Sequence, residues 1–420
     1  MKKTRRREFL KYSLASAGTL VWGPAVLSQD FLGSRQTGPE IASDMKIKVT
    51  SMQPFMIKGA RMYAAWNLVR LGTEDGLEGI GEGSAYGGWG NIAPPRRING
   101  YIQQMGQACM DAGAISLSEF YSQVVAPGGT ADKGREWYCA AAAIELAMWD
   151  ICGKLAKKPL YALLGKQLRD TIPVYANHGV FFTSDTSNPF DANRILQMKQ
   201  ADYALYKWDP FNKGGAPGQT EIDACVGQIT KARELVGSDY PLGIDAYSRF
   251  NVAGGTMAAK TMEAMNVVFF ENPVSYDDVD GFKSVAVATT IPLATGEDFY
   301  TLPQFQRFID SGAVKILQPD VGVCGVLTAM QAARFADARG IQMYPHVWCG
   351  PIVARATAHM ASVWPNVGFM EYAACSPDVS WENDLISPPN TVVNGHLVVP
   401  SGHGLGITLN ETLVQQRLVK

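Results

Sequence analysis

The stretch from Asn266 to Glu297, NVVFFENPVSYDDVDGFKSVAVATTIPLATGE, holds the pattern that decides the fold. Two short apolar runs within it, NVVFFE and IPLATGE, each end on a glutamate, at Glu271 and Glu297. The residues between the two runs have the apolar spacing of a helix. The stretch therefore predicts a strand, a helix and a second strand, which is one repeat unit of a parallel α/β fold.

The same pattern recurs throughout the second half of the chain. Eight short apolar runs end on a polar residue, and these end residues are His178, Lys207, Asp245, Glu271, Glu297, Asp320, His346 and Glu371. Successive end residues are 29, 38, 26, 26, 23, 26 and 25 positions apart, enough for one strand, one helix and two loops. Eight such units predict a closed (β/α)8 barrel of the TIM type. A doubly wound open sheet would alternate in the same way, but its phosphate-binding turn GxGxxG follows none of the runs.

The position of an active site follows from this barrel. Barrel enzymes carry their functional residues at the carboxyl ends of the strands, so the eight end residues are predicted to converge on one pocket.

The residues that flank the barrel predict a second domain of α+β class. Alternating runs after Met45, with turn residues from Thr73 to Gly76, indicate a hairpin, and residues 93–165 have helical periodicity. The predicted divisions are a signal peptide and linker at 1–43, an α+β capping domain at 44–170, the barrel at 171–375, and a C-terminal segment at 376–420 that returns to the capping domain.

Composition and charge bound the possible partners. The chain has 420 residues, 47% of them hydrophobic, and a formal net charge of -2, so no strong field favours nucleic acid or an anionic membrane. A small-molecule ligand is the expected partner. The seven cysteines are odd in number and widely spaced, which predicts buried thiols.

The first residues of the chain resemble an export signal. Arg6, Arg7, Phe9, Leu10 and Lys11 follow the twin-arginine order R-R-x-F-L-K, and a mildly apolar segment comes next. That segment is short for a membrane span. No cysteine follows it that could carry a lipid anchor. We expect a bacterial protein that is exported folded to the periplasm, without a stable membrane anchor; a disordered basic tail is the alternative.

Three consecutive strands end in carboxylates, at Asp245, Glu271 and Glu297. Three like charges in one pocket repel each other unless a cation neutralises them. Oxygen ligands without histidine or cysteine favour Mg2+ over zinc. The alternative is that each carboxylate caps a helix or pairs with a local lysine or arginine.

The remaining strand ends supply acid and base groups. Asp320 and His346 end neighbouring strands, so the carboxylate can hold one imidazole nitrogen and make the other a general base. Lys207 lies across the pocket, with Asp209 two residues on and facing the same way. Lys207 is predicted to bind a substrate carboxylate or to move a proton; a salt bridge to a metal-ligating carboxylate is its alternative.

These residues together predict one class of reaction. Mg2+ would bind a substrate carboxylate, a base would remove the proton from the adjacent carbon, and the metal would stabilise the resulting enediolate.

At this point the motifs show a family likeness. The stretches AIELAMWDICGKLAKKPLYALLG, FFENPV, IPLATGEDF, ILQPDVGVCGV and YPHVWCGPI are similar to motifs of the enolase superfamily. The chain resembles the mandelate racemase and muconate lactonizing enzyme group, and within it sugar-acid dehydratases of the galactonate type. The resemblance implies Asp245, Glu271 and Glu297 as Mg2+ ligands, Asp320 and His346 as the base, Glu371 near the substrate carboxylate, and a homo-oligomer, either a dimer or an octamer.

Two departures from the family pattern concern the second acid or base. Racemase-like members have K-x-K at the second strand, whereas this chain has Lys207 followed by Trp208 and Asp209. The galactonate-type pattern has D-x-H at the third strand, and here Tyr247 replaces that histidine. Tyr247 is predicted to protonate the leaving hydroxyl, with a pKa lowered by Mg2+ and Lys207, or else to contact substrate without catalysis. His178 is a second candidate acid, and Trp348 is predicted to shape the pocket wall.

The leading hypothesis is Mg2+-dependent dehydration of an aldonic or related sugar acid to a 2-keto-3-deoxy acid. A cycloisomerase or epimerase would use the same enediolate with a different second step. A periplasmic binding protein that has lost catalysis is the alternative from another class.

Overall fold

A computed structural model describes residues 43–59, 64–84, 90–127, 133–178, 192–211, 218–372 and 377–420. The chain divides into two units, Met1–Pro39 and Glu40–Lys420, and all described residues belong to the second. The predicted export signal therefore lies outside the described residues.

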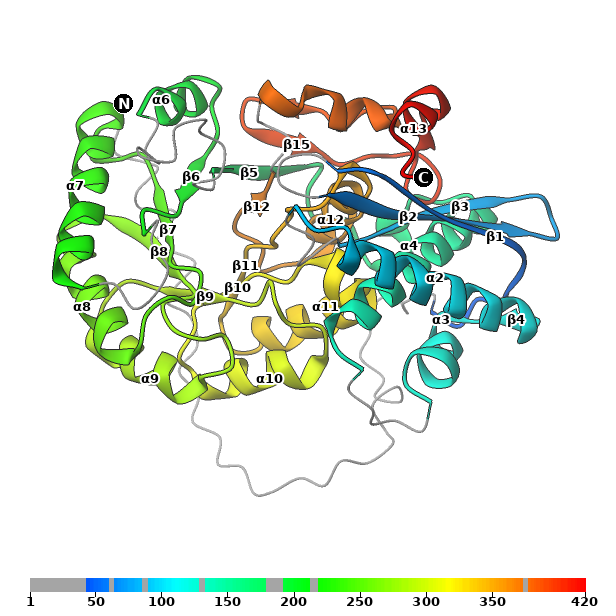
Figure 1. Ribbon diagram of the computed structural model, residues 1–420, viewed down its shortest axis with the longest axis horizontal. Coiled ribbons are helices and arrows are strands. Elements are labelled where there is room, and N and C mark those ends of the chain that lie inside the picture. Colours follow the sequence, from blue (N-terminus) through cyan, green and yellow to red (C-terminus); the bar gives the residue numbers. More distant parts are fainter. Residues whose placement is uncertain are drawn as a thin grey trace. The chain divides into compact units, whose positions relative to one another are not determined.

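Eight parallel strands form a closed barrel (Figure 1). They are β5 (Thr171–His178), β6 (Leu205–Trp208), β7 (Leu242–Asp245), β8 (Val267–Glu271), β9 (Leu293–Thr295), β10 (Ile316–Leu317), β11 (Gln342–Met343) and β12 (Met370–Glu371). Each of the first six pairs parallel with the next. The ring closes where Glu371 of β12 pairs with Tyr175 of β5 and where Met343 bridges Val367. The predicted barrel is confirmed.

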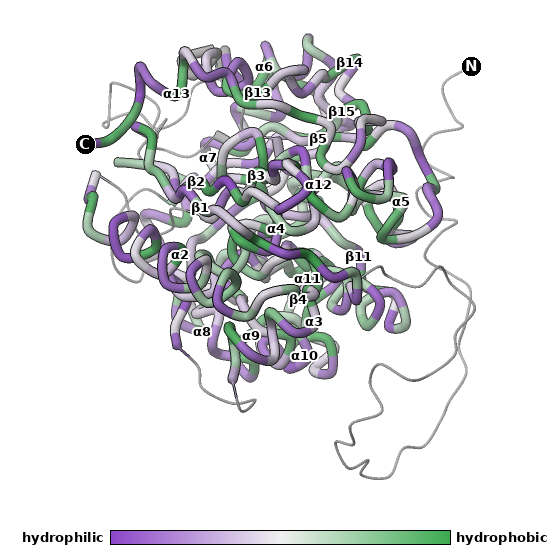
Figure 2. The backbone as a smooth tube through the Cα atoms, turned by 90° about the vertical axis from the view of Figure 1, so that its right-hand side faces the viewer, coloured by the Kyte–Doolittle hydropathy of each residue, from purple (hydrophilic) through white to green (hydrophobic). Residues whose placement is uncertain are grey.

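Seven α-helices follow the first seven barrel strands and surround them in Figure 1. They are α6 (Ala192–Gln200), α7 (Gln219–Val236), α8 (Val252–Met262), α9 (Val279–Ala288), α10 (Leu302–Ser311), α11 (Val321–Asp337) and α12 (Pro351–Val363); a 3-10 turn, η4 (Glu263–Met265), extends α8. Figure 2 shows purple and green alternating along α9 and α10, as expected for helices with one face on the barrel and one in solvent.

The eighth unit differs from a regular (β/α)8 repeat. In the part of the chain that the structure describes, β12 is followed by a 3-10 helix, η6 (Pro377–Leu385), and not by an α-helix. The barrel is therefore a modified one.

Three of the eight predicted strand ends lie beyond their strands. Glu297, Asp320 and His346 come two or three residues after β9, β10 and β11 end. Gly296 has a φ of 134° and breaks the strand before Glu297, and Pro319 and Pro345 lack the N–H that a central strand would use. These three side chains therefore belong to loops at the carboxyl edge of the barrel.

The capping domain is an antiparallel sheet covered by helices. The sheet has the order β3-β2-β1-β4, from β1 (Ile47–Lys58), β2 (Ala65–Thr73), β3 (Glu78–Gly83) and β4 (Ala114–Ile115). The helices are α2 (Ala93–Asp111), α3 (Leu117–Glu119), the π-helix η2 (Phe120–Val125), α4 (Arg135–Ala156) and α5 (Leu160–Leu164). The predicted hairpin is confirmed as β2–β3, and the helical periodicity of residues 93–165 is confirmed by α2, α4 and α5.

Close contact between β3 and α4 requires glycine in the strand. A Cβ added at Gly79, Gly81 or Gly83 would lie 2.1, 1.9 or 2.3 Å from a backbone carbonyl oxygen of α4. The glycines on one face of β3 leave Ile80 and Glu82 on the other face, which turns toward the barrel.

The C-terminal residues contact both parts of the fold. They form β13 (Ile386–Ser387), β14 (Val392–Val393), β15 (His396–Val398), β16 (Thr408–Leu409) and α13 (Glu411–Arg417). Strand β15 pairs antiparallel with β5 of the barrel. At the end of the chain, Val419 N donates to the Met56 carbonyl of β1, and Arg70 of β2 forms an ion pair with Glu411 at 2.7 Å. Figure 1 shows α13 above the capping strands.

No helix within the described ranges is long and apolar enough to cross a membrane. The cysteines of those ranges, Cys109, Cys139, Cys152, Cys225, Cys324 and Cys349, are buried free thiols as predicted, and Cys375 lies outside them.

Candidate active site

The alternation of strand residues builds the site above an apolar layer inside the barrel. Tyr175, Leu205, Phe269, Ala294, Ile316 and Tyr344 form a buried cluster there. Two residues further along their strands, on the same face, come Asn177, Lys207 and Glu271. Gly243 gives the Phe269 ring room, because a Cβ at Gly243 would lie 2.5 Å from the ring. Asp245 follows Gly243 by the same two-residue step.

The three predicted metal-ligating carboxylates are buried at this edge of the barrel. Asp245, Glu271 and Glu297 are 1%, 0% and 4% exposed. Asp245 Oδ2 and Glu271 Oε1 have no hydrogen-bond partner among the described residues. Burial and the Glu271 charge raise the pKa of Asp245 well above its usual value. Buried carboxylate oxygens without a partner indicate a site that is built to receive a cation.

Lys207 partly supplies that cation. Its Nζ lies 2.7 Å from Glu271 Oε2, 3.5 Å from Asp245 Oδ2 and 3.9 Å from Glu371 Oε1. Burial alone would lower the pKa of Lys207, but the charges of Glu271 and Glu371 raise it well above its usual value. The side chain is therefore a fixed ammonium ion, and it makes the salt bridge that the sequence left open as its alternative role.

His346 lies between Asp320 on one side and Glu297 and Glu371 on the other. Its Nδ1 lies 2.8 Å from Asp320 Oδ2, and its Nε2 lies 3.0 Å from Glu297 Oε2 and 3.6 Å from Glu371 Oε2. Burial would lower the pKa of His346, but Glu371 and Glu297 raise it well above its usual value. Burial likewise opposes ionisation of Glu297, yet the His346 charge lowers the pKa of Glu297 to about 2. The predicted contact between Asp320 and His346 is present in the structure.

No group of three or more His, Cys, Asp and Glu side chains in the described ranges is arranged to hold a metal ion. The predicted trio departs from such an arrangement because Lys207 and His346 contact oxygens of Glu271 and Glu297 that a metal would use. The chemistry of the trio still fits a hard divalent cation, since all its donors are carboxylate oxygens and two of them have no hydrogen-bond partner among the described residues.

Glu371, predicted near the substrate carboxylate, is fully buried. It accepts hydrogen bonds from Asn177 Nδ2, from Tyr175 Oη at 3.4 Å and from the Val347 backbone N at 3.2 Å. These donors come from β5 and from the loop after His346. Glu371 therefore connects that loop to strand β5.

Tyr247 lies beside Asp245 in a left-handed turn. Tyr247 and Ser248 have φ values of 47° and 58°, and the Tyr247 backbone N donates to Asp245 Oδ1 at 2.9 Å. Burial and the Asp245 charge raise the pKa of Tyr247 well above its usual value. The Lys207 charge acts in the expected, lowering direction but is outweighed, so the phenol stays protonated here and can donate a hydrogen bond.

Asp209 does not face the same partners as Lys207. Its carboxylate forms an ion pair with Arg249 at 2.6 Å and accepts from the Phe211 N at 2.7 Å. The Arg249 guanidinium lies 5.6 Å from the centre of the Tyr247 ring. Asp209 thus anchors the loop that carries Tyr247, and a substrate contact of Asp209 stays a prediction.

Two further predicted residues complete the set. His178 ends β5 opposite Trp208, but its side chain lies outside what the structure describes. Trp348 is 7% exposed, two residues after His346. Both roles stay predictions.

The sequence reasoning missed several polar residues of the site because it took one residue for each strand. Gln318 Nε2 donates to Glu271 Oε2 at 2.6 Å, and Asn272 Nδ2 donates to Glu297 Oε1 at 3.3 Å. Asn177 directly precedes His178, and Gln318 lies two residues before Asp320. Residues two apart on a strand share a face, and this period is the signal that could have found Asn177 and Gln318.

Family models match both parts of the chain. A model described as "Enolase C-terminal domain-like" matches residues 192–413, and one described as "Mandelate racemase / muconate lactonizing enzyme, N-terminal domain" matches residues 44–165.

Individual relatives cover almost the whole chain. A D-xylonate dehydratase of Haloferax volcanii is 28% identical over 385 residues, which are 89% of each chain. A D-galactonate dehydratase of Verminephrobacter eiseniae is 26% identical over 88% of this chain and 94% of its own. Among solved structures, a mandelate racemase/muconate lactonizing enzyme from Jannaschia sp. CCS1 is 26% identical with a TM-score of 0.80, over 89% of this chain and 98% of that one.

Proposed function

Because this chain belongs to the mandelate racemase and muconate lactonizing enzyme group of the enolase superfamily, we propose that it dehydrates a sugar acid to a 2-keto-3-deoxy acid. The observation that carries the proposal is the position of His346, whose Nδ1 is held by Asp320 while Nε2 faces the buried carboxylates. The dehydratase names of the xylonate and galactonate relatives support elimination of water as the second step.

His346 is the proposed general base. Asp320 holds Nδ1, so when the imidazole is neutral the proton stays on Nδ1 and Nε2 carries the lone pair. Nε2 can take the proton from the carbon beside the substrate carboxylate once it no longer contacts Glu297. Asp320 then stabilises the imidazolium that forms.

Asp245, Glu271 and Glu297 are the residues that would hold Mg2+. When bound, the ion would stabilise the negative charge that develops on the substrate carboxylate as the proton leaves. Lys207 keeps part of the charge of Glu271 and Asp245 neutralised within the same buried cluster.

Loss of the hydroxyl group completes the reaction. The bond between the 3-carbon and its oxygen breaks, and the electrons of the former C–H bond form the new double bond. We assign the proton that turns the departing hydroxide into water to the Tyr247 phenol, which burial keeps protonated. The resulting enol then tautomerises to the 2-keto-3-deoxy acid.

The test is an assay of the full-length chain with Mg2+ in D2O against a library of aldonic acids. Formation of a 2-keto acid is the expected result. Deuterium at the α-carbon of recovered acid without 2-keto acid would support epimerisation, and a new cyclic or isomeric acid would support cycloisomerisation. If no acid in the library exchanges its α-proton or is consumed, the enzyme hypothesis is wrong and a binding role remains.

We further propose that the chain is exported to the periplasm. The proposal rests on Arg6 and Arg7 and on the apolar segment after them. Normal periplasmic delivery of a variant with both arginines changed to lysine would contradict it. The homo-oligomer implied by the family likeness is a second proposal, which sedimentation at several protein concentrations would test.

A further inference from the structure

The N-terminus of helix α12 lacks a capping side chain of its own. Gly350 occupies the N-cap position and Pro351 follows it, so no side-chain hydrogen bond closes the first turn. The first N–H groups of a helix need acceptors from elsewhere, especially when the helix end is buried. All of the residues from Pro351 to Ser362 are buried.

Glu82 of the capping domain supplies these acceptors. Its Oε1 accepts from the Gly350 N, and its Oε2 accepts from the Ile352 N at 3.2 Å and from the Val353 N at 3.1 Å. Glu82 is 1% exposed, and the glycine at position 350 is required by the contact, since a Cβ there would lie 2.6 Å from Glu82 Oε1. One carboxylate of β3 therefore satisfies three backbone donors of a barrel helix.

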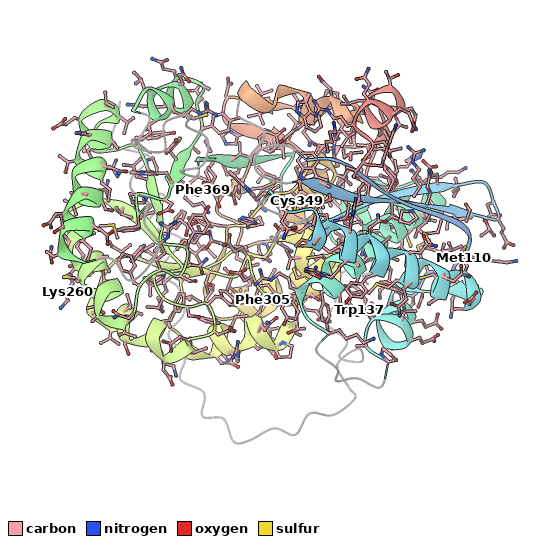
Figure 3. The ribbon with its side chains drawn as sticks, viewed as in Figure 1. Met110, Trp137, Lys260, Phe305, Cys349 and Phe369 are labelled. Carbon is pink, nitrogen blue, oxygen red and sulfur yellow. The ribbon has the colours of Figure 1, made fainter. Side chains whose placement is uncertain are left out.

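The loop that Glu82 holds in this way is the loop of the proposed base. Residues 344–350 include His346 and lead directly into α12. Within this loop, Val347 N donates to Glu371, and the Cys349 thiol lies 3.5 Å from Asp320 Oδ2. Figure 3 shows Cys349 near the ends of the capping strands.

A second contact joins the same end of β3 to the helix that Asp320 begins. Ser84 N donates to the Gly322 carbonyl at 2.8 Å, and Asp320 is the N-cap of α11. A Cβ at Gly322 would lie 3.0 Å from Cys349 Sγ and 3.1 Å from Ser84 N. The end of β3 thus lies between the two loops that carry Asp320 and His346.

We propose that Glu82 is a positioning residue for the Asp320–His346 pair, which it holds in place through the N-terminus of α12. The capping domain thereby fixes the geometry of proton transfer as well as covering the barrel. This inference rests on the proposed function. A proton-transfer group that is displaced by a fraction of an ångström loses rate without losing substrate affinity, so the effect belongs in kcat more than in KM.

Glu145 provides a matched control. It is also a fully buried glutamate of the capping domain, and its Oε1 accepts from a barrel helix, at the Leu327 N of α11, at 2.8 Å. That contact comes after the kink at Gly325, where φ is 76°, and so lies beyond the turn that Asp320 caps. Glu145→Gln removes a capping-domain carboxylate of the same kind without touching residues 344–353.

The experiment compares Glu82→Gln and Glu82→Asp with Glu145→Gln in the full-length chain. We expect Glu82→Gln to lower kcat about 10- to 100-fold with little change in KM. We also expect faster backbone hydrogen exchange in the segment 344–353, measured by mass spectrometry. Glu82→Asp keeps the charge and shortens the side chain, so it should give an intermediate loss and carries the test if Glu82→Gln does not fold. Glu145→Gln should leave both kcat and that segment within about twofold of the parent.

Three outcomes are decisive. Equal losses of kcat in Glu82→Gln and Glu145→Gln would show that the residues act through stability alone and would overturn the proposal. Unchanged exchange in 344–353 for both Glu82 variants would also overturn it. If the parent transforms no acid, the proposed function fails, but the exchange measurement still decides whether Glu82 holds the loop.

Discussion

The barrel and the capping domain each bury a group of three carboxylates, and they satisfy these charges in different ways. In the capping domain, both oxygens of Glu82, Glu145 and Asp150 accept hydrogen bonds, mainly from backbone N–H groups. The other donors are one lysine, one tyrosine hydroxyl and one tryptophan N–H. In the barrel, Asp245 and Glu271 each leave one oxygen without a hydrogen-bond partner among the described residues.

The difference separates structural from functional carboxylates. Backbone donors are fixed, so a carboxylate that they satisfy on both oxygens has little capacity left for a ligand. The barrel carboxylates instead contact the charged side chains of Lys207 and His346. A buried charge with an incomplete shell is costly unless a ligand completes it, so the barrel group is where a cation and substrate are expected.

Changing one glutamate in each group tests most directly whether the barrel carboxylates are functional and the capping-domain carboxylates structural. Glu271→Gln should lower activity by roughly 10³-fold or more, because it removes the charge and one oxygen of a proposed metal ligand and weakens the ion pair with Lys207. At a Mg2+ concentration of 100 times its Kd, binding of Mg2+ should raise the unfolding free energy of the parent by about 3 kcal/mol. Glu271→Gln should lack most of this increase. Thermal unfolding with Mg2+ and with EDTA measures it.

Glu145→Gln is the control for that measurement. It should unfold at a lower temperature but keep the full Mg2+-dependent shift and the activity. An equal Mg2+ shift in the parent and in Glu271→Gln would refute the assignment of Glu271 as a metal ligand.

His346→Asn tests whether the imidazole of the barrel group removes a proton or only neutralises Glu297. Loss of a general base costs about 10²- to 10⁴-fold in kcat. The asparagine keeps hydrogen-bonding capacity toward Asp320, so the fold should persist and the α-proton should no longer exchange with D2O. Exchange at the parental rate would show that another group is the base and that His346 only neutralises Glu297.

How far the sequence predicts this site depends on the kind of contact. The eight apolar runs placed Asp245, Glu271 and Glu371 at the ends of barrel strands, because the strand and its polar end residue are adjacent in the chain. The same spacing brought Asp320 and His346 together. These are properties of local pattern and of barrel geometry, which repeat along the sequence.

Contacts between distant loops were beyond the sequence pattern. The pairing of Asp209 with Arg249 depends on how two loops turn after their strands, and the pKa of Tyr247 depends on burial that no local pattern reports. The acceptor role of Glu82 is of the same kind, since it joins residues that are 268 positions apart. Such contacts need the folded coordinates.

Tyr247→Phe is expected to have a smaller effect than the two barrel variants. If the phenol protonates the leaving hydroxyl, dehydration should fall about 100-fold while exchange of the α-proton continues, because proton removal precedes loss of water. Mass spectrometry of recovered substrate separates the two steps. Dehydration as fast as in the parent would exclude Tyr247 as the acid and leave His178 as the candidate to test.

The smallest effect is expected in the capping group and concerns stability alone. Burial raises the pKa of Glu145 to about 7 against the 4.5 of an ordinary glutamate, although the Tyr121 hydroxyl and the Leu327 N oppose the shift. The folded state therefore binds a proton more readily than the unfolded state, and this contribution to stability is lost as the pH rises from about 4.5 through about 7. The loss amounts to about 3 kcal/mol between these limits.

Glu145→Gln cannot titrate, so its unfolding free energy, measured in urea at several pH values, should fall less steeply than that of the parent. Parallel pH curves for the two proteins would mean that backbone donors keep Glu145 ionised across this range, and the contrast with the barrel carboxylates would then lie in hydrogen bonding and not in charge.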